Sequence, residues 1–140
     1  MRCESVHKIN LPEGLGADEE AVKRRFGSLE RYRRFLRMLP EDDNADRLER
    51  AVRAEDYGEA FRCAHTIKGL AATLELGPLL ETAVCLTEEL RRPPYDERKI
   101  REECRRLRQE MDRCCGLFRR IWRGEPYFIS KVKYGFLSHL

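Results

Sequence analysis

The chain has 140 residues, a mass of 16.6 kDa and 41% hydrophobic residues, which fits one compact domain with its own core and leaves no room for a second. Its 28 basic and 25 acidic residues leave a net charge of only +3, so neither nucleic acid nor an anionic membrane is indicated as a partner. No apolar run approaches the length of a membrane span, and the first residues carry no signal segment. We therefore expect a cytoplasmic protein.

The six cysteines show neither zinc-knuckle nor redox-motif spacing, and three of them fall at apolar positions of helical patterns. We expect reduced and mostly buried thiols rather than a disulfide framework. These residues are Cys3, Cys63, Cys85, Cys104, Cys114 and Cys115.

The first half of the chain predicts a short helix followed by a longer, interrupted one. Residues 1–13 are irregular; Asp18 is placed to cap a helix that ends near Phe26, and Ser28 to cap the next. Pro40 interrupts the apolar spacing, which resumes afterwards, so we expect either one kinked helix or two nearly continuous ones. The apolar stripe consists of Leu29, Tyr32, Leu36, Leu39, Ala45, Leu48 and Val52.

A helix carrying His65 should follow a turn at residues 55–57 and run to about Leu76, where Gly77 and Pro78 would stop it. At about 100° per residue, its apolar residues share one arc, and His65 points about 160° away from that arc. The arc contains Ala60, Cys63, Ala64, Ile67, Leu70, Ala71 and Leu74. His65 therefore lies on the side that faces away from the core.

Two further helices complete the pattern, one from about Pro78 to Arg91 and a long one after Pro93 and Pro94. The long helix repeats apolar residues at steps of four and three, as in a bundle, at Ile100, Cys104, Leu107, Met111, Cys114, Phe118 and Ile121. Its arginines alternate with acidic residues at pairing distance, which favours a solvated face over a nucleic-acid patch.

Together these elements predict an all-α fold, an antiparallel up-and-down four-helix bundle with a short extra N-terminal helix. We expect residues 1–13 to be an irregular N-terminal segment and residues 14–123 to form the bundle. Residues 124–140 fit no helical pattern and would form a tail, either docked on the bundle or disordered.

The neighbours of His65 indicate chemistry rather than packing. Gly69 and Ala72 lie one and two turns further on the same side, and Lys68 flanks it. A glycine inside a helix lowers helix stability by on the order of 1 kcal/mol relative to alanine, so the presence of glycine at position 69 calls for an explanation. These small residues would leave an open approach through which another protein could bring a phosphoryl group to the nucleophilic imidazole, and Lys68 would attract the phosphoryl oxygens.

The segment Ala64-His65-Thr66-Ile67-Lys68-Gly69 resembles the signature of histidine-containing phosphotransfer (HPt) domains, and the similarity extends over about residues 14 to 122. The resemblance implies that His65 is the phosphoacceptor, with Lys68 as its electrostatic helper and Gly69 as its steric one. It also implies a two-component phosphorelay in which response-regulator receiver domains, a hybrid histidine kinase, or both are the partners.

By the same resemblance this chain is a phosphoryl carrier, not an enzyme by itself: it binds no cofactor, and the Mg²⁺ belongs to the partner receiver. It has no kinase signature or Gly-rich ATP loop. We expect a monomer whose partner-facing residues include Arg62, Ala72 and Glu75. Glu75 departs from the family, which usually has glycine there; on the helical wheel it would lie about 40° from His65 and modulate partner choice.

Two alternatives remain from the sequence. A degenerate HPt-like helical module would bind a partner through the same face without being phosphorylated. A metal or nucleic-acid binder would use His7, His139, the cysteines and the basic last helix, but those ligands lack metal spacing and the charges are compensated.

Overall fold

The computed structural model describes residues 17–121 of the chain, with the side chains of residues 17–118. Within that range the regular structure is all helix, as the sequence predicted. The elements are α2 (Glu19–Phe26), α3 (Leu29–Leu36), a 3₁₀ turn (Leu39–Glu41), α4 (Asn44–Arg53), α5 (Tyr57–Thr73), α6 (Gly77–Leu90) and α7 (Glu97–Ile121).

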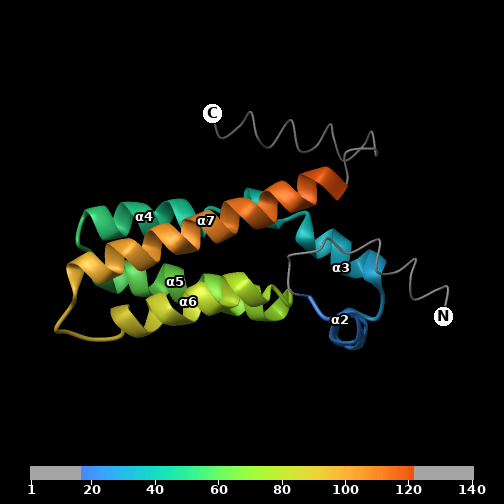
Figure 1. Ribbon diagram of the computed structural model, residues 1–140, viewed down its shortest axis with the longest axis horizontal. Coiled ribbons are helices and arrows are strands. Elements are labelled where there is room, and N and C mark those ends of the chain that lie inside the picture. The colour runs from blue at the N-terminus through green and yellow to red at the C-terminus, as the bar shows by residue number, and fades with distance from the viewer. Residues whose placement is uncertain (1–16, 122–140) are drawn as a thin grey trace.

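Helices α4 to α7 form an antiparallel up-and-down bundle (Figure 1). Each helix packs against its neighbour in sequence, and α7 returns to pack against α4, which closes the ring of four. Consequently α5 lies between α4 and α6 and diagonally across from α7. The predicted bundle is thereby confirmed, and α5 keeps one side free of other bundle helices.

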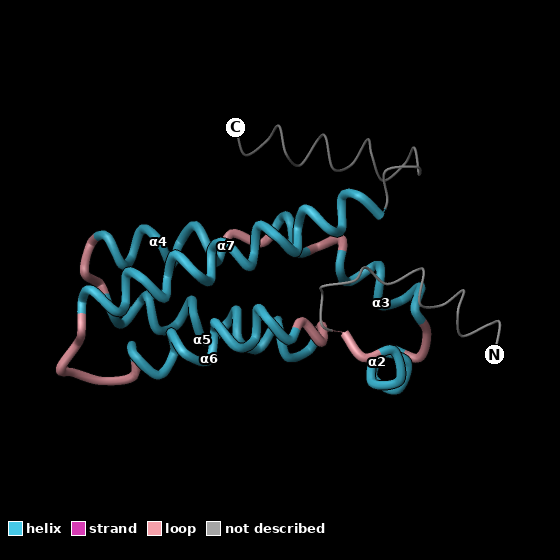
Figure 2. Tube along the Cα trace, viewed as in Figure 1, coloured by secondary structure: helices cyan, strands magenta, loops and turns pink. Residues whose placement is uncertain are grey.

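Helices α2 and α3 lie at one end of the bundle, beside the start of α4 (Figure 2). Their predicted caps are confirmed: Asp18 Oδ1 accepts from the Glu20 amide at 3.2 Å, and Ser28 Oγ from the Arg31 amide at 3.2 Å. The 3₁₀ turn that contains Pro40 separates α3 from α4. The sequence left open one kinked helix or two nearly continuous ones; the structure has two helices, with the 3₁₀ turn and a few further residues between them.

Tyr32 fastens α3 to the end of α5. Its ring is fully buried, and its hydroxyl donates a 2.6 Å hydrogen bond to the carbonyl of Leu74. Burial raises the pKa of the phenol far above its usual value, so the hydroxyl stays protonated and remains a donor. This contact fixes the end of α5 on which part of the candidate site lies.

The core is made of the predicted apolar faces. On α7 the expected residues from Ile100 to Phe118 are buried, and on α5 the predicted arc is buried apart from the half-buried Leu70. The arginines of α7 pair with acidic neighbours, for example Arg101 with Glu97 at 3.0 Å and Arg113 with Glu110 at 2.7 Å. The prediction of a solvated, ion-paired face is confirmed for these residues.

One predicted boundary is wrong. Helix α5 ends at Thr73 rather than at about Leu76, so Gly77 and Pro78 do not stop it. Gly77 and Pro78 begin α6, whose predicted start at about Pro78 is confirmed. Glu75 has a positive φ of 57°, which turns the chain, and the Leu76 amide donates to the carbonyl of Ala71 at 2.9 Å. Pro78 is tolerated because the first turn of a helix needs no amide donor there.

The predicted segments 1–13 and 124–140 lie outside the described residues, so those domain boundaries stay predictions. Of the five described cysteines, Cys63, Cys104, Cys114 and Cys115 are buried, Cys85 is exposed, and none is in a disulfide within residues 17–118. No helix of the described part is long and apolar enough to cross a membrane.

Candidate functional site

His65 lies in the middle of α5 on the side that no bundle helix covers. Asp56 caps the start of α5, with its Oδ1 accepting from the Glu59 amide at 3.1 Å, and burial of the opposite face fixes the helix against α4 and α6. The imidazole is exposed, and within residues 17–118 neither ring nitrogen makes a hydrogen bond. Both nitrogens are therefore available to a reagent from solution.

Gly69 and Ala72 continue this exposed side beyond His65. A Cβ placed on Gly69 would meet nothing within 4 Å, so no packing contact in the described chain requires a glycine there. Ala72 is also exposed, and Lys68 is half-buried beside them. The predicted open approach to the imidazole is present in the structure; what it admits stays a prediction.

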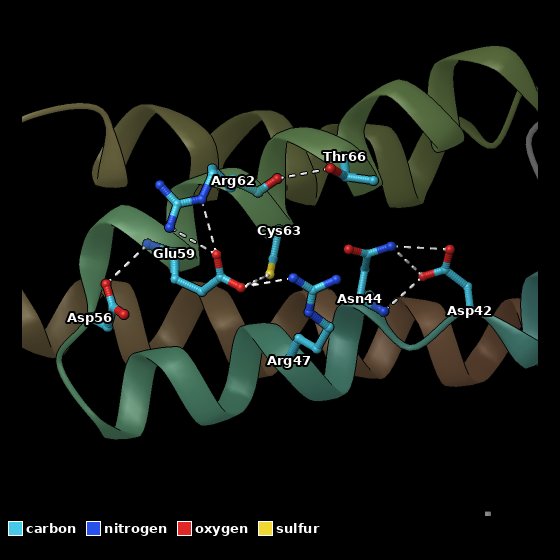
Figure 3. A network of polar contacts seen from close by, with 8 residues as sticks. All are labelled: Asp42, Asn44, Arg47, Asp56, Glu59, Arg62, Cys63 and Thr66. Atoms are coloured by element: carbon cyan, nitrogen blue, oxygen red, sulfur yellow. Dashed lines mark hydrogen bonds and ion pairs between the residues drawn. The ribbon is translucent and has the colours of Figure 1, made fainter.

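Arg62, one turn before His65, is held by a network that reaches α4 (Figure 3). Its Nε donates to Glu59 Oε1 at 3.0 Å, while Glu59 Oε2 accepts from Arg47 on α4 at 2.9 Å. These hydrogen bonds from the two arginines, Arg47 first, lower the pKa of the Glu59 carboxyl, which therefore stays ionised between them. The Arg62 side chain is itself largely exposed, at 69%, and its contact with a partner stays a prediction.

Phe61, beside His65, and two residues on the far side of the Phe61 ring were not singled out from the sequence. The ring of Phe61 lies 5.9 Å from the imidazole centroid, and the guanidinium of Arg91 lies 5.8 Å from the centroid of Phe61. Glu88 accepts from Arg91 at 2.6 Å. Phe61 could have been found, since it lies four residues before His65 on the same helix. Arg91 and Glu88 lie at the end of α6, and only the packing of α6 on α5 brings Arg91 to the Phe61 ring.

The helical-wheel position expected for Glu75 is wrong, because that residue lies beyond the end of α5. Its left-handed backbone conformation is the one that glycine adopts most readily, which accounts for the glycine usual at this place in the family it resembles. The carboxylate pairs with Arg25 of α2 at 3.1 Å. Glu75 thus connects α2 to the turn after α5, and its contact with a partner stays a prediction.

An apolar groove adjoins the far end of this exposed side, between α3 and α5. Two of the exposed large hydrophobic side chains, Phe35 and Met38, line it together with Leu70 and Thr73 of α5. Acidic residues border it at the start of α4. The open strip along α5 from His65 therefore leads to a surface able to take apolar side chains.

The residues that the alternative metal site would use are not gathered in the described structure. Among residues 17–118 no three histidine, cysteine, aspartate or glutamate side chains are placed to hold a metal ion. His7 and His139 lie outside the described residues. The site around His65 thus offers a nucleophile with cationic neighbours, and its own residues do not form a metal cage.

Comparison with known proteins agrees with this geometry. A family model described as the Hpt domain matches residues 32–115, from Tyr32 of α3 to the last third of α7. Comparisons with curated proteins and with solved structures gave no match. The family match spans α4, α5, α6 and most of α7, and it includes His65 and its neighbours. The chain therefore belongs to the Hpt domain family, whose members carry phosphoryl groups in two-component signalling.

Proposed function

We propose that this protein accepts a phosphoryl group on His65 and passes it on, with receiver domains of response regulators, a hybrid histidine kinase, or both as its partners. The observation that carries this proposal is the exposed imidazole beside Gly69, where an added Cβ would meet nothing. A helix gains stability when alanine replaces such a glycine, and no contact within residues 17–118 requires glycine here, so the space would admit an approaching partner.

The reaction is an exchange between an aspartyl phosphate and an imidazole. The Nε2 lone pair of His65 forms a bond to phosphorus as the phosphorus–oxygen bond to the partner's aspartate breaks, and that bonding pair leaves with the carboxylate. Nδ1 keeps its proton during the step and releases it to solvent afterwards. Such transfers need positioning and charge stabilisation more than further covalent chemistry.

The roles of the surrounding residues follow from where they lie. Lys68 would attract the phosphoryl oxygens, and Gly69 and Ala72 would leave space for the partner's active site. Arg62 would pair with acidic groups at the rim of the partner's active site. The partner would supply the Mg²⁺, since within residues 17–118 no three histidine, cysteine, aspartate or glutamate side chains are grouped to hold a metal ion. The groove beside Phe35 and Met38 offers apolar area for docking.

The direct test is labelling with a phosphorylated receiver. The purified protein should acquire a phosphoryl label that is lost in acid and kept in base, and His65→Gln should acquire none. The chain has only three histidines, so His7→Gln and His139→Gln are matched controls that should both be labelled like the wild type.

The same experiment separates the alternative function. If His65→Gln and the wild type bind a receiver equally and neither is labelled by any receiver or kinase of the source organism, the protein is a binding module and the proposal is wrong. A phosphoryl label that persists in His65→Gln would show that another residue is the acceptor.

A further inference from the structure

The groove between α3 and α5 presents apolar side chains that the described chain leaves uncovered. Phe35 and Met38 are 46% and 61% exposed, and Leu70 and Leu74 of α5 continue the lining. The groove has a volume of about 440 Å³, which is within the range of sites that bury a ligand. Adjoining apolar side chains that are this exposed are typical of a surface that binds a further segment.

The border of the groove adds a charge preference. Three acidic residues at the start of α4 line it, and two of them, Glu41 and Asp43, are exposed. The third, Asp42, accepts from the Asn44 amide at 2.9 Å and so is used within the fold. An apolar surface with an acidic border favours an occupant that combines apolar side chains with positive charge.

The chain itself contains a segment of that composition, residues 127–137. It carries two lysines, Lys131 and Lys133, no acidic residue, and the aromatic residues Tyr127, Phe128, Tyr134 and Phe136. Residues 1–16, the other candidate from this chain, have no aromatic residue and as many aspartates and glutamates as lysines and arginines. Complementarity of charge and of apolar character therefore favours residues 127–137 as the occupant.

Helix α7 ends close enough to the groove for this segment to reach it. The helix runs to the end of the bundle at which α3 lies (Figure 1). The pKa of Tyr32 on α3 is raised mainly by burial, then by Glu75 and by Cys114 of α7, so the last third of α7 lies near α3. From Ile121 to Tyr127 an extended chain spans up to about 20 Å, roughly twice the spacing of packed helices.

We propose that residues 127–137 of this chain bind in the groove between α3 and α5. The aromatic side chains of the segment would cover Phe35 and Met38, and its lysines would lie beside Glu41 and Asp43. Because the segment is tethered to the same chain, its effective concentration at the groove is on the order of millimolar, so weak contacts are enough. The docking involves no covalent step and needs no phosphoryl group.

A segment bound there would also affect the approach to His65. Leu70 and Thr73 belong both to the groove and to α5, next to the open strip formed by Gly69 and Ala72. The bound segment would therefore compete with a partner that uses this surface. This consequence rests on the proposed function, whereas the docking does not.

The test of the docking is photo-cross-linking within the full chain. The cross-linker p-benzoylphenylalanine is placed at position 38 in place of Met38, and the peptide joined to it is identified by mass spectrometry in the product with the mass of one chain. The matched control carries the same group in place of Val84, an exposed apolar residue of α6 that does not line the groove. The probe at position 38 should join to residues 127–137, and the probe at position 84 should not.

Substitutions in the segment test what holds it. Tyr134→Ser/Phe136→Ser should lower the cross-link yield at position 38 by about 10-fold or more, because two aromatic side chains no longer gain from burial. Lys131→Glu/Lys133→Glu should lower it by about 3-fold, the worth of exposed ion pairs. Adding Glu41→Lys/Asp43→Lys to the latter variant should restore the yield, since the charges are then exchanged across the groove.

Four results would overturn the docking. These are no product with residues 127–137, equal yields from positions 38 and 84, a product with residues 1–16 instead, and a product that joins two chains. The last two would assign the groove to the other end of the chain or to a second copy.

The effect on transfer is measured separately. Tyr134→Ser/Phe136→Ser should be labelled at His65 about 2- to 10-fold faster than the wild type, because the competing segment has left the groove. Equal labelling rates would overturn the competition. A wild type that no receiver labels would overturn the proposed function, and the cross-link alone would still decide the docking.

Discussion

The two faces of α5 are built from similarly small residues and serve opposite purposes. The buried face carries Ala60, Cys63, Ala64, Ile67 and Ala71, all inside the core. The exposed face carries His65, Thr66, Gly69 and Ala72. On the buried face the small side chains let α4 and α6 pack closely against α5; on the exposed face no helix of the bundle packs at all.

This difference teaches that a small residue is explained by its surroundings, not by its type. A larger side chain at Ala64 would meet the fully packed core, whereas a Cβ at Gly69 would meet empty space. Within residues 17–118 the lower helix propensity of glycine at position 69 is matched by no packing contact. Gly69 is therefore the position at which the proposed approach of a partner can be tested.

The largest expected effect on stability comes from removing the central side chain of the buried face. Ile67 is fully buried, so Ile67→Ala should lower the free energy of unfolding by about 2–5 kcal/mol through lost burial and the cavity left behind. Thr66→Ala, one residue away on the exposed face, should change it by less than about 0.5 kcal/mol. Urea unfolding of both variants measures the contrast, and equal losses would contradict the assignment of the two faces.

Placing the same large residue on each face tests the comparison further. Ala64→Leu should cost about 1–3 kcal/mol by overpacking the core. Gly69→Leu should leave the fold intact and add up to about 1 kcal/mol, because leucine favours a helix over glycine.

In the transfer assay the more stable variant, Gly69→Leu, should be the one that loses phosphoryl transfer. Gly69→Leu should slow labelling of His65 by a factor of ten or more, because its side chain would occupy the partner's approach. Gly69→Ala is the graded control: it should gain nearly the same stability and lose less transfer. If Gly69→Leu is labelled as fast as the wild type, the open strip has no role in access.

Much of this architecture could be predicted because apolar periodicity depends only on which face is buried. The arc on α5 and the seam on α7 follow from spacing alone, and the position of His65 opposite the core follows with them. The residues of the site that lie on α5 could therefore be predicted from the sequence.

Contacts between helices far apart in sequence could not be predicted, because residue spacing along one helix does not say which side chains of another helix pack against it. Arg91, with Glu88 bound to it, reaches the ring of Phe61 only through the packing of α6 on α5. The hydrogen bond from Tyr32 to the Leu74 carbonyl joins residues 42 positions apart. The end of α5 was misplaced because the turn is made by a glutamate, whereas a glycine there would have marked it.

The smallest expected effect is the difference in folding stability between glycine substitutions in the turns at the two ends of α5. Glu55, just before α5, and Glu75, just after it, have nearly equal positive φ values of 55° and 57°, so glycine relieves a similar strain at each. Glu75 also pairs with Arg25 at 3.1 Å, whereas Glu55 makes no ion pair within residues 17–118.

Glu55→Gly should therefore stabilise the fold by up to about 1 kcal/mol, since the strain relieved slightly exceeds the extra freedom that glycine gives the unfolded chain. Glu75→Gly should gain less by the worth of its exposed pair, about 0–1 kcal/mol. Adding Arg25→Ala to both variants should erase the difference between them in urea unfolding. A greater gain from Glu75→Gly would mean that the pair with Arg25 opposes folding, which would leave contact with a partner as the stronger reason for a glutamate at this turn.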